Sequence, residues 1–499
     1  MRKLLIILCC FFVPAKLAAQ SSALLAADSA RYLLYETGKL SHTFVHTFMP
    51  DGYNTVRLGY TYGKGKYVPA QGSTQTGNIA FNTEGKTTLG KVDLWGQFGY
   101  QRITEDSTRF AHQTRSNPTT PYYMGSPAPV SYNRTLYQAA VTGQRMFFRD
   151  HLPLSVGLDY RIGNHFSVND PRGNLSEYQF NLSAGTGYVW RAKLTATIDG
   201  YYGYGQEVLN VAYKNLSYVQ SYAYPNYANY LINGYGEPVL KQLDRKYNNK
   251  MKRAGGGYSL VWKDSTTGII ALTGKWIKEQ QHYIFQSGDG FDSLSNYTLR
   301  TSSMHLIWSR RSWTAALHYQ AQKGEDFHLR YLANNYQYRG KDYAAQIAHN
   351  HKRSNYTLAV AGHNTERLDG ITGNHVRYTL LTVRPSFGMV MQTKQQDYWG
   401  YALSLHYGKA LGNTFSVNNA NAGLFTQQVI YHDYYFNTAD QAGANLELHY
   451  NKHFPGCYAG IKANIGYLRG LHFSTLILDK ALMPGKDNVS ASLSLNFYF

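Results

Sequence analysis

A period-two alternation of apolar and polar residues recurs along most of this chain and limits what it can fold into. Near the start, Val56, Leu58 and Tyr60 alternate with Arg57 and Gly59. Successive side chains of a β-strand point to opposite faces, so the alternation predicts strands with one apolar and one polar face. The alternating segments are about 9–11 residues long, which is the length that a tilted strand needs to cross a bilayer.

The same pattern runs to the last residue. The chain ends in ASLSLNFYF, with Leu495, Phe497 and Phe499 on one face. The last residues of a soluble domain are usually frayed. A sheet in hydrocarbon must instead pair all its strands, because each unpaired N–H or C=O group costs several kcal/mol. We therefore expect the final strand to pair with the first, which begins at Asn54.

Short and long connections alternate between these segments. Short turns lie near Gly85–Leu89 and Arg149–His151, and long loops near Ile103–Tyr132 and Val208–Lys250. One short-turn rim and an even strand count are typical of bacterial membrane barrels. The sequence thus predicts an all-β fold, a transmembrane antiparallel up-and-down β-barrel. We expect about 18 strands, with about 16 as the alternative, short periplasmic turns and long extracellular loops.

Tryptophans mark the expected short-turn rim. Amphipathic indole rings favour the headgroup level of a membrane. Five of them lie at or near predicted short turns and are expected to form one aromatic girdle: Trp190, Trp262, Trp308, Trp313 and Trp399.

The N-terminal residues divide into two segments before the barrel. Residues 1–19 predict a secretory signal peptide, with Arg2 and Lys3 before an apolar run and cleavage near Ala19. Residues 20–53 form a periplasmic N-terminal segment, and residues 54–499 the barrel. Within the segment, Ser22–Lys39 is either a short amphipathic helix that plugs the barrel or a disordered leader. The segment is too short for a globular TonB-dependent plug domain, so energised transport by this chain alone is not expected.

The signal peptide, the strand pattern and the terminal Leu493-x-Leu495-x-Phe497-x-Phe499 together resemble bacterial outer-membrane β-barrel proteins. The Tyr-rich strands are similar to an uncharacterised group of such barrels, since the chain has 45 Tyr. The resemblance implies a location in the outer membrane of a diderm bacterium. It also implies that Leu495, Phe497 and Phe499 form the signal read by the barrel-insertion machinery. It implies no substrate.

The balance of charge indicates further partners. The formal net charge is +19, and a basic protein commonly meets nucleic acid, which an exported chain does not encounter. Outer-membrane lipid and lipopolysaccharide are therefore the expected partners, with another outer-membrane or surface protein as a further one. The basic run Lys241–Arg253 either meets lipid phosphates at the outer rim or is simply solvated.

The polar face of the strands is expected to line the interior of the barrel, the lumen. It is read either as a polar conduit or solute site, or as the wall of a barrel filled by its own loops. The Tyr-rich stretch Tyr218–Pro238 either contacts sugars or proteins, or folds over the barrel mouth. The candidate binding residues of the lumen are His305, His318, His363, His406, His449, Arg57, Arg161, Asp159 and Asp199.

These features predict a porin-like channel or an uptake-associated solute-binding barrel. The first alternative is a non-transporting barrel that acts as a scaffold or partner in a surface or secretion complex. The second is a membrane-embedded hydrolase that uses His432 and Asp433, because an acid and an imidazole can activate water. Adjacent residues of a strand point apart, however. The sequence has no GxSxG, HExxH, CxxC or P-loop motif, so we expect no enzyme, cofactor or metal site.

Overall fold

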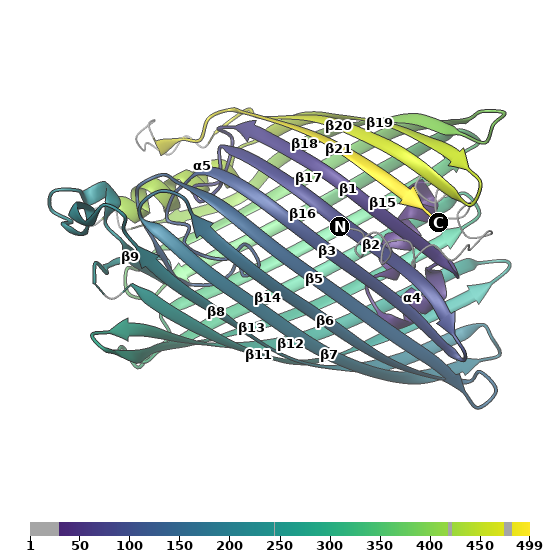
Figure 1. Cartoon of the computed structure of the whole chain (residues 1–499), viewed down its shortest axis with the longest axis horizontal. Coiled ribbons are helices and arrows are strands. Elements are labelled where there is room, and N and C mark those ends of the chain that lie inside the picture. Colours follow the sequence, from purple (N-terminus) through teal and green to yellow (C-terminus); the bar gives the residue numbers. More distant parts are fainter. Residues whose placement is uncertain (1–28, 244, 418–421, 474–481) are drawn as a thin grey trace, which may run out of the picture.

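Eighteen antiparallel strands close into one barrel in the computed structural model (Figure 1). The structure describes residues 29–243, 245–417, 422–473 and 482–499. The predicted up-and-down barrel of about 18 strands is confirmed. The barrel strands are β1 (Tyr53–Gly65), β2 (Gln75–Leu89), β3 (Val92–Thr108), β5 (Val130–Phe147), β6 (Leu152–Ser167), β7 (Arg172–Trp190), β8 (Leu194–Ala212), β11 (Lys246–Asp264), β12 (Gly268–Ser287), β13 (Gly290–Arg310), β14 (Trp313–His328), β15 (Tyr336–His351), β16 (Ser354–Asp369), β17 (His375–Gln392), β18 (Tyr398–Ser416), β19 (Gln441–Phe454), β20 (Cys457–Gly470) and β21 (Asp487–Tyr498).

The barrel closes where its first and last strands meet. Strand β1 pairs with β21 over its whole length, with Val56 opposite Phe497 and Leu58 opposite Leu495. Every barrel strand therefore has a partner on both sides, as a sheet in hydrocarbon requires. The expected pairing of the last strand with the first is confirmed.

The alternation assigns the two faces of the wall. Leu58 and Leu495 are exposed on the outer surface, whereas Arg57 lines the lumen and lies opposite Asn496. The predicted periplasmic girdle also faces outward, because Trp190, Trp262, Trp313 and Trp399 are exposed large side chains. Trp308 belongs to the same rim and donates to the Thr267 carbonyl oxygen at 3.0 Å.

Several strands are longer than their alternation indicates. Strand β8 continues to Ala212 and β11 begins at Lys246, so the predicted long loop Val208–Lys250 loses residues at both ends. The alternation of apolar and polar residues is lost at these strand ends because the inward face also becomes apolar. Leu209, Val211 and Tyr247 are buried under the loops that cover the barrel mouth.

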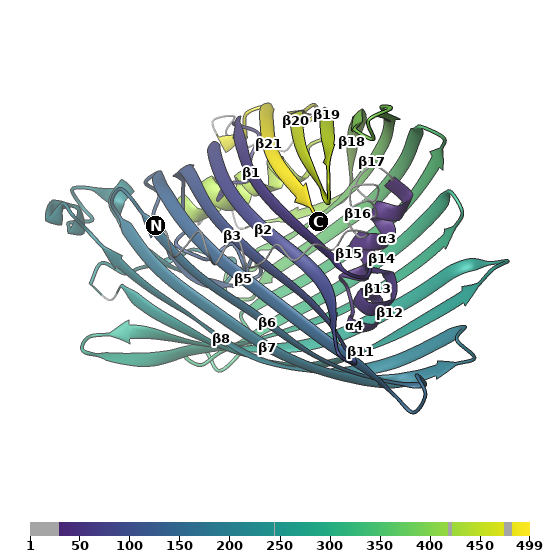
Figure 2. The same ribbon diagram turned by 45° about the vertical axis from the view of Figure 1, so that its right-hand side comes forward.

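Two helices lie inside the barrel near its periplasmic end (Figure 2). They are α3 (Ser29–Gly38) and α4 (His42–Phe48), and they are called the N-terminal helices below. Helix α3 approaches β13–β16, and α4 approaches β3, β5 and β6. The predicted signal peptide, residues 1–19, and its cleavage near Ala19 lie outside the described residues. None of the helices in the described ranges has the length and apolarity to span a membrane.

The extracellular end carries the remaining elements. A small three-stranded sheet forms from two loops that are far apart in the chain, the β3–β5 and β8–β11 loops. The loop between β18 and β19 carries two short helices over residues 426–437. The elements are β4 (Tyr122–Gly125), η1 (Leu216–Val219), η2 (Pro225–Tyr227), β9 (Tyr230–Asn233), β10 (Val239–Leu240), η4 (Thr426–Tyr431) and α5 (His432–Asn437).

Candidate functional site

A cavity of about 620 Å³ occupies the periplasmic half of the lumen, between helix α3 and the barrel wall. It is called the periplasmic cavity below. Its lining comes from α3 and from strands on both sides of the β1–β21 seam, and includes Arg57, Glu84, Glu447, His449 and Lys462. A space of this size, lined by side chains of both signs, suits a small polar solute.

Ion pairs arrange the charges of the periplasmic cavity. Lys462 Nζ lies 2.8 Å from Glu447 Oε1, and His449 Nδ1 lies 4.0 Å from the same oxygen. On the helix side, Lys39 bridges Glu36 at 3.1 Å and Glu84 at 3.0 Å. Opposite charges are thus present on both walls, which favours a neutral or zwitterionic solute over a strongly charged one.

A single carboxylate from the wall anchors helix α3. Glu84 of β2 accepts hydrogen bonds from the hydroxyls of Tyr35 and of Tyr53, the latter at 2.5 Å. It also pairs with Lys39. Burial, together with the Glu84 carboxylate, raises the pKa of the Tyr35 hydroxyl, so this hydroxyl stays a donor. The attachment of α3 therefore combines this polar anchor with an apolar contact, because Leu33 and Leu34 pack against the cluster of Phe44, Val261, Ala271 and Ile307.

Helix α4 is attached by a series of hydroxyl contacts. Ser41 caps the helix by accepting from the Phe44 N–H at 3.2 Å, and it lies 3.0 Å from the Ser259 hydroxyl of β11. Thr43 lies 2.6 Å from the Thr197 hydroxyl of β8. Short polar side chains of the lumen wall thus meet the first turn of the helix.

An apolar contact adds to this attachment. The Phe44 side chain is fully buried, with 0 % exposure, and packs against Val261, Ala271 and Ile307 of the lumen wall. Burying a phenyl ring contributes about 1.5–3 kcal/mol, so α4 is held more firmly than a polar contact alone would hold it.

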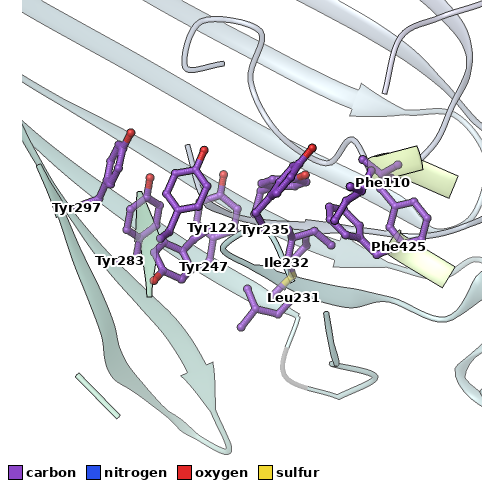
Figure 3. Packing of buried hydrophobic residues seen from close by; sticks show 14 of the residues in the cluster. Phe110, Tyr122, Leu231, Ile232, Tyr235, Tyr247, Tyr283, Tyr297 and Phe425 are labelled. Carbon is purple, nitrogen blue, oxygen red and sulfur yellow. The ribbon is translucent and has the colours of Figure 1, made fainter. Parts of the chain in front are cut away.

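A large apolar cluster, called the mouth core below, packs loop residues against wall residues at the extracellular end (Figure 3). Strand β4 pairs with β9, with Tyr123 opposite Ile232, and this loop sheet packs onto inward-facing side chains of the barrel. The mouth core includes Tyr122, Leu231, Ile232, Tyr235, Tyr247, Tyr283, Tyr297, Phe110 and Phe425.

Buried hydrogen bonds fix the mouth core to the wall. The Tyr122 hydroxyl donates to Asp326 of β14, and the Thr120 and Tyr283 hydroxyls lie 2.6 Å apart. Asp369 of β16 accepts from the Tyr235 N–H at 3.0 Å. Residues of three strands are thus hydrogen-bonded to the loops within the mouth core.

The Tyr-rich stretch Tyr218–Pro238 behaves in two ways. Leu231, Ile232 and Tyr235 are buried in the mouth core, so this half folds into the barrel. The other half stays outside, where Tyr218 and Tyr227 stack with ring centroids 3.9 Å apart and Tyr222 is fully exposed.

Of the nine predicted lumen residues, only Arg57 and His449 line the periplasmic cavity. The others lie on strands around the whole lumen, and the structure does not gather them into one site. His305 and His318 stack with centroids 4.0 Å apart, and His363 bonds to Asp342. The remaining ones lie outside the periplasmic cavity: Arg161 lies 3.4 Å from Glu177, Asp159 lies 3.4 Å from Asn181, Asp199 faces Gly257, and both ring nitrogens of His406 are buried.

Glu84 is the residue that sequence reasoning missed. It lies beside a predicted turn, but NTEGK continues the alternation of β2, with Asn82, Glu84 and Lys86 on one face. That spacing was the available signal. Lys86 acts in a similar way, since its ammonium lies 2.7 Å from Asp51 just after helix α4.

The pair His432 and Asp433 does not sit at a strand or loop edge, as expected, but at the junction of η4 and α5. His432 Nε2 lies 2.9 Å from the Val68 carbonyl oxygen, and Asp433 accepts from the Ala70 N–H at 2.8 Å. Burial raises the pKa of Asp433. Both side chains therefore tie α5 to the β1–β2 loop. Within the described ranges, no three His, Cys, Asp or Glu residues are grouped as metal ligands.

A closed barrel with an apolar outer wall, a polar lumen and one short-turn rim is the architecture of outer-membrane β-barrel proteins, and the predicted resemblance to that class is confirmed. The chain belongs to a family of unknown function, DUF6850, whose model matches residues 42–499. No curated protein matches the chain.

Solved structures with a similar fold include outer-membrane transporters and receptors. The FrpB iron transporter from Neisseria meningitidis (F3-3 variant) is 8% identical, with a TM-score of 0.41 over 92% of this chain and 83% of that one. BauA, the ferric preacinetobactin receptor from Acinetobacter baumannii, is 9% identical, with a TM-score of 0.42 over 90% and 80%. The ferric citrate transporter FecA is 7% identical, with a TM-score of 0.43 over 89% and 78%.

Proposed function

We propose that this protein is an outer-membrane barrel for the uptake of a small polar solute, and that the structure is its closed state. The observation that carries the proposal is the periplasmic cavity. The lumen next to α3 is an open polar space of about 620 Å³, whereas a barrel that served only as a scaffold has no need of one.

The N-terminal helices are the periplasmic closure in this proposal. Helix α3 rests on a half-buried polar anchor at Glu84, which borders the periplasmic cavity. Movement of α3 away from Glu84 widens the cavity and withdraws Leu33 and Leu34 from their apolar contact with the wall. Helix α4, with Phe44 in an apolar contact, stays as the hinge end of this segment.

The mouth core is the extracellular closure. It is large and apolar, so it opens only when something outside supplies free energy, such as a solute or a partner that binds the exposed half of the Tyr-rich loop. The mouth core is also the observation that favours the alternative, a non-transporting barrel that scaffolds a surface or secretion complex, because a permanently shut mouth conducts nothing.

Solute uptake into proteoliposomes separates the two functions. Ile232→Asp places a charge at a position with 0 % exposure. Because this position lies on the loop sheet and not on a barrel strand, the substitution loosens the mouth core and leaves the strand pairing of the barrel intact. Tyr222→Asp is the matched control, since Tyr222 lies in the same loop and is fully exposed.

We expect the wild type and Tyr222→Asp to be slow, and Ile232→Asp combined with Tyr35→Ala and Lys39→Ala to admit small sugars such as glucose. Exclusion of glucose by this combined variant, in a barrel that is correctly folded by gel mobility, would favour the scaffold.

A further inference from the structure

Four basic residues lie directly opposite one another on four adjacent strands. Lys278 of β12 faces Arg300 of β13, Arg300 faces Lys323 of β14, and Lys323 faces Arg339 of β15. These four residues are called the basic row below. The strand register thus places four cations side by side on four neighbouring strands.

The basic row lies on the outer surface. Its members share their faces with Trp276, Met304, Leu317 and Tyr343, which are exposed large apolar side chains of the same four strands. The lumen face of these strands carries the alternate residues, such as Ile307. The row therefore belongs to the lipid-facing wall and not to the periplasmic cavity.

The height of the row follows from the strand bounds. Lys278 lies about ten residues from the periplasmic start of β12 at Gly268, and Lys323 about the same number from the start of β14 at Trp313. A spanning strand needs about 9–11 residues. The basic row thus stands at the outer edge of the hydrocarbon, at the headgroups of the outer leaflet.

Like charges directly opposite each other on a sheet repel and destabilise it. Glu325 offsets part of this repulsion, with oxygens 2.9 Å from Arg300 and 3.1 Å from Lys323. Glu366 lies 3.5 Å from Arg339 but also 2.9 Å from His375. The ion pairs formed by the described residues thus bring two carboxylates to four cations, and the row keeps an excess of positive charge.

The outward residues on the periplasmic side of the row carry less charge than the row itself. The next outward positions are Trp276, Ser302, Ala321 and Lys341, which again lie opposite one another. The short Ser302 and Ala321 side chains thus stand between two long ones. Tyr319 and Tyr343 follow, with ring centroids 5.2 Å apart. The basic row therefore stands on the extracellular side of outward positions that include exposed aromatic and apolar side chains, as phosphates stand above acyl chains.

We propose that the basic row binds the phosphate groups of a lipid A-type glycolipid of the outer leaflet. Arginine suits this role because its planar guanidinium forms two parallel hydrogen bonds to one phosphate, and lysines add charge on either side. This site is independent of the proposed uptake function, since it lies on the opposite face of the wall.

Native mass spectrometry of the full-length protein in detergent tests the site. The probes are bisphosphorylated lipid A, the same lipid A after enzymatic removal of both phosphates, and phosphatidylglycerol. The test variant is Lys278→Gln with Arg339→Gln, which removes two cations that do not share Glu325. The control is Lys91→Gln with Lys394→Gln, which removes two exposed lysines from periplasmic turns.

We expect the test variant to bind bisphosphorylated lipid A at least tenfold more weakly than the wild type, and the control to bind it equally well. The dephosphorylated lipid should bind weakly to all three proteins. If the test variant does not fold, Lys278→Arg with Arg339→Lys should fold and retain binding, and Lys278→Gln alone should weaken it about threefold.

Three results would overturn the proposal. The first is unchanged binding by the folded test variant or by Lys278→Gln. The second is equal binding of phosphorylated and dephosphorylated lipid A. The third is binding of phosphatidylglycerol as tight as that of lipid A, which would mean that the row attracts any anionic headgroup.

Discussion

Asn54 and Phe499 exchange both of their backbone hydrogen bonds. The Asn54 N–H donates to the Phe499 carbonyl oxygen at 3.1 Å, and the Phe499 N–H donates to the Asn54 carbonyl oxygen at 2.9 Å. The last residue of the chain is thus fixed beside the first residues of β1. The seam of the barrel has no frayed end at its periplasmic rim.

Deleting Phe499 should weaken this seam. The deletion leaves Asn54 without two backbone partners, and each lost hydrogen bond costs about 0.5–1.5 kcal/mol. On a semi-native SDS gel, we expect the folded band of the deletion variant to convert to the unfolded band at a lower temperature than that of the wild type. Phe499→Leu keeps both backbone hydrogen bonds and should melt close to the wild type. If the deletion and Phe499→Leu melted alike, the closing hydrogen bonds would not matter for stability.

Phe44→Ala should release helix α4 from the lumen wall. The phenyl ring is fully buried against Val261, Ala271 and Ile307, and loss of a buried Phe costs about 3–5 kcal/mol. We expect faster hydrogen exchange over residues 41–49 and an unchanged barrel melting temperature. Phe48, only partly buried beside the same cluster, gives the matched comparison in Phe48→Ala, which should have a smaller effect. Equal protection of α4 in all three proteins would contradict the seating of this helix.

Acid should loosen helix α4 through His46. Burial, together with the nearby Lys86 ammonium, lowers the pKa of His46 from 6.5 to about 4, and neither ring nitrogen has a hydrogen-bond partner. When α4 is released, His46 binds a proton below its ordinary pKa of 6.5, whereas in the seated helix it stays neutral down to a pH of about 4. The attachment of α4 is therefore complete above pH 6.5 and weakens as the pH falls toward 4.

The measurement is hydrogen exchange of α4 at pH 7.5, 6 and 5, corrected for the intrinsic rate. His46→Gln should flatten the pH dependence. Slower corrected exchange of α4 at pH 5 than at pH 7.5 would contradict the prediction.

The strands were predictable because the bilayer imposes one rule on every outward position. Leu58, Leu495 and Tyr343 obey it independently of what lies in the lumen, so alternation alone identifies them. The inward side follows no such rule. Tyr122 reaches Asp326 across a sequence separation of 204 residues, and nothing local in either strand or loop indicates that meeting.

The site was predictable only in part for the same reason. Alternation indicated that Arg57 and His449 face inward, but it could not indicate that helix α3 covers one side of the lumen and leaves the periplasmic cavity on the other. Glu84 anchors helix α3 through Tyr35, which lies 49 residues away in the sequence. Contacts between a plug and a wall depend on where the plug docks.

Single-channel conductance in planar bilayers tests the central claim, that two closures in series shut a polar lumen. Four proteins are compared: the wild type, Tyr35→Ala with Lys39→Ala to release α3, Ile232→Asp to loosen the mouth core, and the combination of all three substitutions. We expect the first three to be mostly silent and the combined variant to conduct steadily. Silence of the combined variant, with its barrel folded, would contradict a conduit, and steady conductance of the wild type would contradict the two closures.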